Sequence, residues 1–154
     1  PMTYVSIRPE RHSYGIIRES GELVIDLTTG AMARATDFCG VRSGRDMDKL
    51  AAAKLAVEPA SKLSAPVIAQ SPLALECKVR EIIPLGSHDM FLAEIVAVDV
   101  EERLLDEAGK LHLEKAGLMA YSHGEYFAMG KKIGSFGYSV RKKRPKNPNL
   151  KKKK

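Results

Sequence analysis

The sequence is poor in the features that mark secreted, metal-binding and membrane proteins. It has two cysteines, Cys39 and Cys77, in unrelated surroundings, which provide neither a disulfide framework nor a four-ligand metal site. No apolar run approaches the length of a membrane span, and the first residues carry no basic-then-apolar export signal. We therefore expect a cytoplasmic protein without a membrane partner.

Several short motifs of known chemistry are also missing. The chain contains no glycine-rich P-loop, no GxGxxG, no HExxH and no internal repeat. These absences remove the common phosphate-binding and zinc signatures, and we expect no metal site.

The basic charge of the chain is concentrated at its C-terminal end. The formal net charge is +6, but residues 141–154 alone hold nine Lys or Arg and no acid, and the other 140 residues carry a net charge of −3. A body of that charge lacks the basic face of a nucleic-acid binder, so we expect no nucleic-acid partner. The tail at 141–154 has almost nothing apolar to bury and repels itself, which predicts a disordered, solubilising or weakly anion-attracting extension.

The length and the hydrophobic pattern indicate one core and one domain. With 154 residues and 44% hydrophobic content, the chain is long enough for a single domain over 1–140. Residue patterning predicts a mainly β protein with short helices (α+β). We expect strands at 2–8, 22–27, 73–83 and 90–100, a helix at 11–20 ended by Gly21, a helix at 29–39 ended by Gly40, a helix from about Arg45, and a surface connector at 55–72.

A loop crowded with anion-binding side chains joins the first expected strand to the first expected helix. Arg8, Arg11 and Ser13 lie there, where free backbone N–H groups and the positive end of a helix dipole favour a phosphate. The alternative is a solvated corner in which Glu10 neutralises its neighbours. The phosphate interpretation indicates a nucleotide-like cofactor.

A second loop, before the helix expected from about Arg45, has the same character. It combines glycines with Arg42, Ser43 and Lys49, and we treat it as a second candidate anion site. The alternative is an ordinary helix start in which Ser43 or Asp46 caps the free N–H groups.

The alternation of apolar and charged residues in 73–83 predicts a half-buried strand in which Cys77 belongs to the core. A turn at 84–89 then predicts a β-hairpin with His88 at its tip. The imidazole there is either a hydrogen-bonding group beside a ligand ring or an exposed turn residue. A further hairpin, turning near Gly109, is expected to connect Val96 to Leu113. Residues 119–127 suit either a site or subunit contact, or ordinary core packing.

Four blocks of the sequence carry a family resemblance: 6–14 (SIRPERHSY), 42–49 (RSGRDMDK), 86–91 (GSHDMF) and 121–127 (YSHGEYF). In this order they resemble flavin reductase-like FMN proteins of the flavoredoxin type, and the likeness runs from Pro1 to about Val140. The resemblance implies a split β-barrel of Greek-key type, a homodimer and a noncovalently bound FMN. It also implies reduction of flavin, or of another electron acceptor, at the expense of NAD(P)H.

The resemblance assigns roles by position. It places Ser6 and Arg8 at the cofactor and Ser13 near its phosphate, with Arg42, Ser43 and Lys49 facing phosphate and ribityl oxygens. His88 matches the hairpin histidine that lies against the isoalloxazine ring in relatives, where a donor tunes the flavin. No residue is expected to be catalytic in the usual sense, because the cofactor carries the chemistry. The resemblance assigns no role to His123.

Family members begin with strands before the equivalent of Pro1, so we expect the domain to be N-terminally incomplete and the natural chain to be longer. Three functions remain open at this point. The first is an NAD(P)H-dependent oxidoreductase that passes electrons to a flavin, a metal or a protein acceptor. The second is an FMN-dependent electron carrier without efficient NAD(P)H oxidation, and the third is a truncated, flavin-free dimerisation module.

Overall fold

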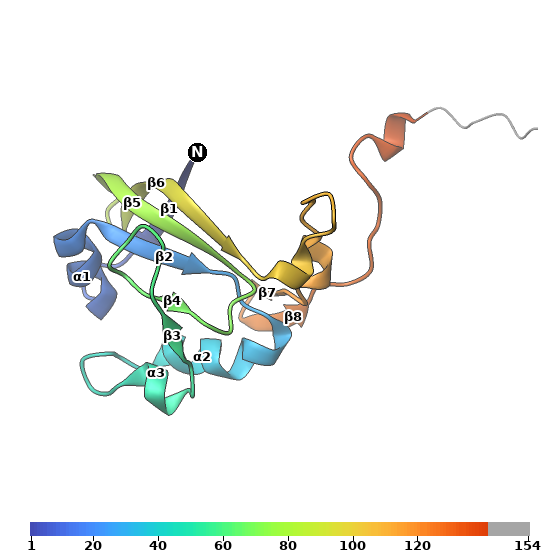
Figure 1. Cartoon of the computed structure of the whole chain (residues 1–154). Helices are drawn as coiled ribbons and strands as arrows, with labels where there is room; N and C mark the ends of the chain where they lie inside the picture. Colours follow the sequence, from blue (N-terminus) through green and yellow to red (C-terminus); the bar gives the residue numbers. More distant parts are fainter. Residues whose placement is uncertain (142–154) are drawn as a thin grey trace, which may run out of the picture.

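The structure is a computed structural model that describes residues 1–141. Its centre is one antiparallel sheet of four strands in the order β1-β6-β5-β2 (Figure 1). The two inner strands form a long hairpin of 12 residues each, and the shorter outer strands pair with its two sides. The strands are β1 Met2–Ile7, β2 Glu22–Asp26, β5 Leu73–Pro84 and β6 Asp89–Val100.

Short helices and two small hairpins surround this sheet. The three α-helices have nine, nine and four residues, which confirms the prediction of a mainly β protein with short helices. The remaining elements are α1 His12–Ser20, α2 Ala33–Val41, α3 Lys49–Ala52, β3 Val57–Glu58, β4 Val67–Ile68, β7 Met119–Ser122 and β8 Glu125–Ala128, with 3-10 turns at Gly30–Met32, Glu102–Leu104, Leu113–Lys115 and Tyr138–Val140. No helix within 1–141 has both the length and the apolar character to cross a bilayer.

The apolar core lies between the sheet and α1. Leu23, Cys77 and Ala93 are buried on one face, and Ile17 of α1 packs against them. Helix α1 ends where the sequence predicts, because Gly21 takes up the left-handed conformation (φ 69°) that a helix C-cap requires. Cys77 is fully buried, and burial raises the pKa of its thiol. Its predicted place in the core is confirmed.

The opposite face of the sheet carries carboxylates that hold the connector in place. Glu22 accepts hydrogen bonds from the backbone N–H (2.9 Å) and hydroxyl (2.7 Å) of Ser64, and Asp26 accepts one from the N–H of Ile68 (3.1 Å). These bonds tie residues 64–68 to β2. The segment is therefore more ordered than the surface connector expected for 55–72, and it contains the short β3–β4 pair that the sequence pattern did not predict.

Glu76 is the buried member of this set. It is fully inaccessible to solvent and accepts the N–H (2.7 Å) and hydroxyl (2.7 Å) of Ser61 and the N–H of Lys62 (2.8 Å). Burial alone would raise its pKa, but these hydrogen bonds outweigh burial, so the pKa lies below its usual value. Asp99 has the opposite shift, since burial and its hydrogen bond with Glu76 both raise its pKa. Glu76 therefore ionises more readily than an ordinary glutamate, and Asp99 less readily than an ordinary aspartate.

Two predicted helix boundaries and one predicted hairpin are wrong. Helix α2 continues through Gly40 and ends at Val41, because that glycine keeps a helical backbone. The next helix begins at Lys49 rather than near Arg45, because Asp48 is the residue that caps it. The hairpin expected from Val96 to Leu113 does not form. The chain makes a 3-10 turn after β6, and only a single bridge between Leu105 and Leu111 flanks the turn at Gly109.

The segment after β8 runs away from the sheet (Figure 1). Its described part, up to Arg141, is exposed to solvent throughout. The disorder predicted for the basic tail concerns residues that, apart from Arg141, lie outside the described part of the chain.

Candidate functional site

The first candidate loop joins β1 to α1 and presents an open helix start. Arg11 is the N-cap residue of α1, and no side chain caps the helix there. Ser13 lies in the first turn and is exposed. Arg8 forms an exposed ion pair with Glu10 at 3.4 Å, which an anion of higher charge can displace. Uncapped backbone N–H groups, a hydroxyl and a guanidinium thus lie close together at the start of α1, where they can bind one anion.

The second candidate loop joins α2 to α3, and its helix start is closed. The Asp48 side chain accepts hydrogen bonds from the N–H groups of Leu50 and Ala51, both at 3.0 Å. Asp48 is therefore the cap, in place of the Ser43 or Asp46 named from the sequence. A carboxylate at that position repels a second anion, so any anion at this loop must be bound by its side chains.

Those side chains have defined places. Arg42 is the exposed C-cap residue of α2. The Ser43 hydroxyl accepts from the Arg45 N–H at 3.2 Å, and the Lys49 ammonium donates to the Cys39 carbonyl at 2.8 Å. Lys49 neutralises the negative end of α2 in this way and retains two further N–H donors.

The two loops lie against each other. The Arg45 guanidinium donates to the Glu10 carbonyl at 3.2 Å. Gly44 faces the His12 ring so closely that an added Cβ would lie 2.9 Å from its Cδ2 atom. The second loop therefore meets the chain at the open start of α1.

The hairpin between β5 and β6 adjoins the other side of the first loop. Asp89, which begins β6, lies opposite Ile7 of β1 and accepts a 2.6 Å hydrogen bond from the Tyr14 hydroxyl. That bond, followed by burial, raises the pKa of Tyr14. The Tyr14 ring also meets Phe91 edge to face at 5.3 Å. Helix α1 is thereby fixed to the hairpin.

His88 lies at the tip of this hairpin. Its carbonyl accepts from the Leu85 N–H at 2.9 Å, and Gly86 supplies the positive φ of 90° that the turn needs. The Nδ1 atom of His88 is 3.0 Å from the Ser87 hydroxyl, while Nε2 has no hydrogen-bond partner among residues 1–141. Ser6 lies nearby on β1, opposite Met90.

The first loop thus lies between the second loop and the tip of the β5–β6 hairpin. The candidate residues are distributed over these three segments. The sequence analysis did not identify the side chains that join these three segments. Tyr14 and Asp89 are 75 positions apart, and Arg45 and Glu10 are 35 apart. Local patterns do not encode such contacts, although Tyr14 and Arg45 fall inside the blocks that carry the family resemblance.

The block at 121–127 forms the β7–β8 hairpin. His123 (φ 51°) and Gly124 (φ 88°) make its two-residue turn, so His123 has a structural place there. The Tyr126 hydroxyl donates to Asp37 of α2 at 3.2 Å. Tyr121 is 67% exposed and Phe127 50% exposed, so these two rings do not pack in the core. Of the two alternatives for residues 119–127, a site or subunit contact is the one left for these rings. No cluster of three His, Cys, Asp or Glu suited to a metal occurs in the described residues.

Comparison with known proteins identifies the family. The family model of the flavin reductase-like domain matches residues 1–130. The chain belongs to this family. The fold is the split barrel of the flavin reductases: a Shewanella frigidimarina flavin reductase with a split barrel domain superposes with a TM-score of 0.79 at 24% identity, covering 90% of this chain and 71% of that one.

Two further solved structures are more similar in sequence. Flavoredoxin of Desulfovibrio vulgaris has a TM-score of 0.84 at 29% identity and covers 92% of this chain and 76% of its own. The FMN-binding protein of Thermus thermophilus has a TM-score of 0.73 at 27% identity and covers 88% and 73%. The kinship of the chain is therefore with flavin-dependent oxidoreductases.

The chain is short beside some curated relatives. A protein of Aeropyrum pernix is 34% identical over 99 residues, which is 64% of this chain but 38% of that protein.

Proposed function

We propose that this domain binds FMN and uses it in an oxidoreductase reaction, taking electrons from NAD(P)H and passing them to a flavin or another acceptor. Membership of the flavin reductase-like family and the similarity to an FMN-binding protein support this proposal. The observation that carries it is the uncapped start of α1, against which the basic second loop is packed.

The residues present fit the phosphate of FMN. A phosphate dianion is bound best by helix N–H groups together with Arg, Lys and hydroxyl donors. Arg8 and Ser13 supply these from the first loop. Arg42, Ser43 and Lys49 supply them from the second, and Ser6 lies on the adjoining strand. In this proposal the Arg45–Glu10 contact sets the spacing of the two loops, and Lys49 orders the second loop through the Cys39 carbonyl.

His88 is the residue we assign to the flavin ring. The Ser87 hydroxyl occupies Nδ1 and leaves Nε2 free for a ligand. A donor or positive charge beside the ring stabilises its reduced form, so the imidazole tunes how readily FMN accepts electrons. When bound, FMN supplies the hydride and electron chemistry, and the chain binds it and orients it.

The absorption spectrum of the purified protein tests the proposal. We expect a yellow protein that retains FMN, or takes it up when it is added. The double variant Arg8→Gln with Ser13→Ala should lose most of the bound flavin, whereas Lys110→Gln, which removes an exposed charge elsewhere, should keep it. A colourless wild-type protein that also fails to take up added FMN would contradict the proposal.

The similarity to flavoredoxin favours one second candidate, an FMN-dependent electron carrier. Oxidation of NADH or NADPH in the presence of free flavin separates the two functions. Turnover many times faster than without the protein supports a flavin reductase. FMN binding with no such turnover supports the carrier.

A further inference from the structure

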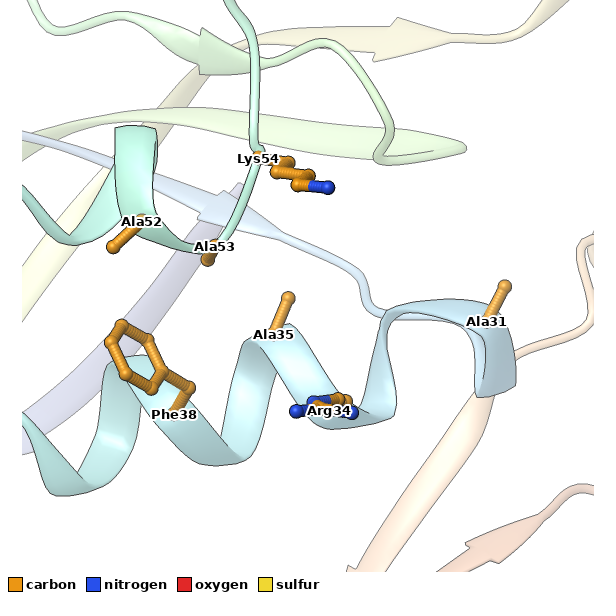
Figure 2. A pocket seen from close by; sticks show the side chains of 7 residues that line it. All are labelled: Ala31, Arg34, Ala35, Phe38, Ala52, Ala53 and Lys54. Carbon is orange, nitrogen blue, oxygen red and sulfur yellow. The ribbon is translucent and has the colours of Figure 1, made fainter.

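A pocket lies between α2 and the end of α3, and none of the residues assigned to FMN lines it. Its volume is about 540 Å³, within the range of small-molecule sites. Helix α2 with the turn before it forms one wall, and the end of α3 with Lys54 forms the other (Figure 2).

Small side chains create this space and two cations border it. Ala35 and Ala53 lie on the two walls, and Phe38 stands at one end (Figure 2). Arg34 projects from α2, while Lys54 extends along the opposite wall. The lining is therefore an apolar floor with an aromatic ring and two positive charges.

The backbone holds Lys54 in an unusual conformation at this wall. Its φ of 56° lies in the left-handed region, which is uncommon for a residue with a Cβ. The Gln70 side chain donates to the Lys54 carbonyl at 3.3 Å and accepts from the Ala56 N–H at 3.1 Å. Gln70 thus supports the turn that places the lysine side chain beside the pocket.

The two cations have no internal partner. Neither Arg34 nor Lys54 forms a salt bridge in the described residues, and no carboxylate lines the pocket. Two positive charges on facing walls of the pocket raise the local concentration of anions. A bare inorganic anion would gain nothing from Phe38 and the alanines. A neutral aromatic would gain only a cation–π attraction from the two cations, without the charge-assisted hydrogen bonds that a carboxylate accepts.

We propose that this pocket binds a small planar organic anion, an aromatic carboxylate being the simplest case. The carboxylate lies between Arg34 and Lys54, and the ring lies against Phe38 and the alanine methyl groups. This site is separate from the FMN site and does not depend on it.

Titration with benzoate, followed by NMR or calorimetry with and without saturating FMN, tests the proposal. We expect saturable binding tighter than about 10 mM in both conditions. Arg34→Gln with Lys54→Gln should weaken it at least about tenfold, and Ala35→Leu, which fills the space, should do the same. The control Lys62→Gln with Lys110→Gln removes the same charge elsewhere and should leave binding unchanged. Neutral benzyl alcohol and inorganic phosphate should each bind at least about tenfold more weakly than benzoate.

Four results overturn the proposal: no saturable benzoate binding, binding that persists unchanged in Ala35→Leu and in the double variant, phosphate binding as tight as that of benzoate, and competition between benzoate and FMN. The last result would assign the pocket to the flavin. Absence of FMN binding would remove the proposed function and leave the benzoate result standing on its own.

Discussion

At the scale of single residues, Glu76 is a fully buried carboxylate that attaches the connector to the sheet. It lies on β5 with no exposed surface and binds three donors of the connector. An ionised carboxylate persists there because these donors replace water. The three hydrogen bonds therefore help to fix the connector between α3 and β5, and a change in this one side chain should weaken that attachment.

We predict that Glu76→Gln lowers the free energy of unfolding by about 2–4 kcal/mol. The amide group of the new side chain places donors opposite donors, so one or more N–H groups lose their acceptor. Urea unfolding at neutral pH measures the effect. Glu81→Gln, an exposed position of the same strand, is the control and should change the free energy of unfolding by less than about 0.5 kcal/mol. Equal effects of the two substitutions would contradict the role given to Glu76.

The raised pKa of Asp99 predicts a pH dependence. The stability that protonated Asp99 contributes is complete below the ordinary aspartate pKa of about 4, and it is lost as pH rises through the higher folded-state pKa. Asn at position 99 keeps a donor toward Glu76 without the ionisation. We therefore expect the wild type to lose stability relative to Asp99→Asn as pH rises from about 4, which unfolding curves at several pH values measure. A difference that stays constant with pH would contradict the raised pKa of Asp99.

At the scale of elements, the β7–β8 hairpin depends on its two-residue turn. His123 and Gly124 both have positive φ, which is the conformation that closes a hairpin with the natural strand twist. The hairpin is attached to α2 through Tyr126 and Asp37 and to the chain before α2 through the bridge between Thr29 and Leu118. Distortion of the turn should therefore loosen the attachment to α2 as well.

We predict that Gly124→Ala costs about 1–2 kcal/mol of stability, because the new Cβ is strained at a φ of 88°. Gly130→Ala is the matched control. Gly130 has no atom within 4 Å of an added Cβ and no positive φ, so that substitution should be neutral or slightly stabilising. Thermal or urea unfolding compares the two. An equal loss in both variants would show that the turn conformation is not the cause.

At the scale of the whole molecule, large apolar side chains are exposed on the β7–β8 hairpin and on the segment that follows it. Tyr121 and Phe127 of the β7–β8 hairpin are exposed, and Ile133 and Phe136 of the following segment are almost fully exposed, at 93% and 105%. Strand β1 pairs only with β6 within the described residues. Patches of this kind mark interaction surfaces. We propose that a second copy of the chain covers them, in line with the homodimer implied by the family resemblance.

Light scattering of the purified protein tests the dimer. We expect twice the chain mass of 16.9 kDa for the wild type. The variant Ile133→Ser with Phe136→Ser should shift the protein toward monomer, because it removes apolar area from the contact. Val98→Ser, an exposed apolar position of β6, serves as control and should remain dimeric. A monomeric wild type at micromolar concentration would exclude the proposal.

Sequence patterns predicted the parts of the fold that depend on neighbours in the chain. The strong alternation in 73–83 gave the β5 strand and the burial of Cys77, and Gly21 marked the end of α1. The misplaced α3 and the missed β3–β4 pair have another cause. Asp48 capping and the Glu76 bonds depend on which side chain reaches a given N–H group, and several candidates in the sequence are equivalent until the chain is folded.

The candidate site, too, could be predicted only in part. The local sequence predicts the two cationic loops, but it does not predict that they adjoin, because this depends on the Arg45–Glu10 and Tyr14–Asp89 contacts between distant segments. The family resemblance rested on four ordered blocks, and the family model, which matches residues 1–130, confirms the family. The roles of the individual residues stay predictions.

Comparison of FMN with riboflavin is the most direct test, since riboflavin differs from FMN only in lacking the phosphate. Fluorescence titration of the purified protein should show FMN binding at least about a hundredfold tighter than riboflavin, because several charge-assisted hydrogen bonds go to the phosphate. Arg8→Gln with Ser13→Ala should reduce that ratio to below about tenfold while leaving riboflavin affinity unchanged. Equal affinities of the wild type for FMN and riboflavin would show that the two loops bind no phosphate, and would contradict the account.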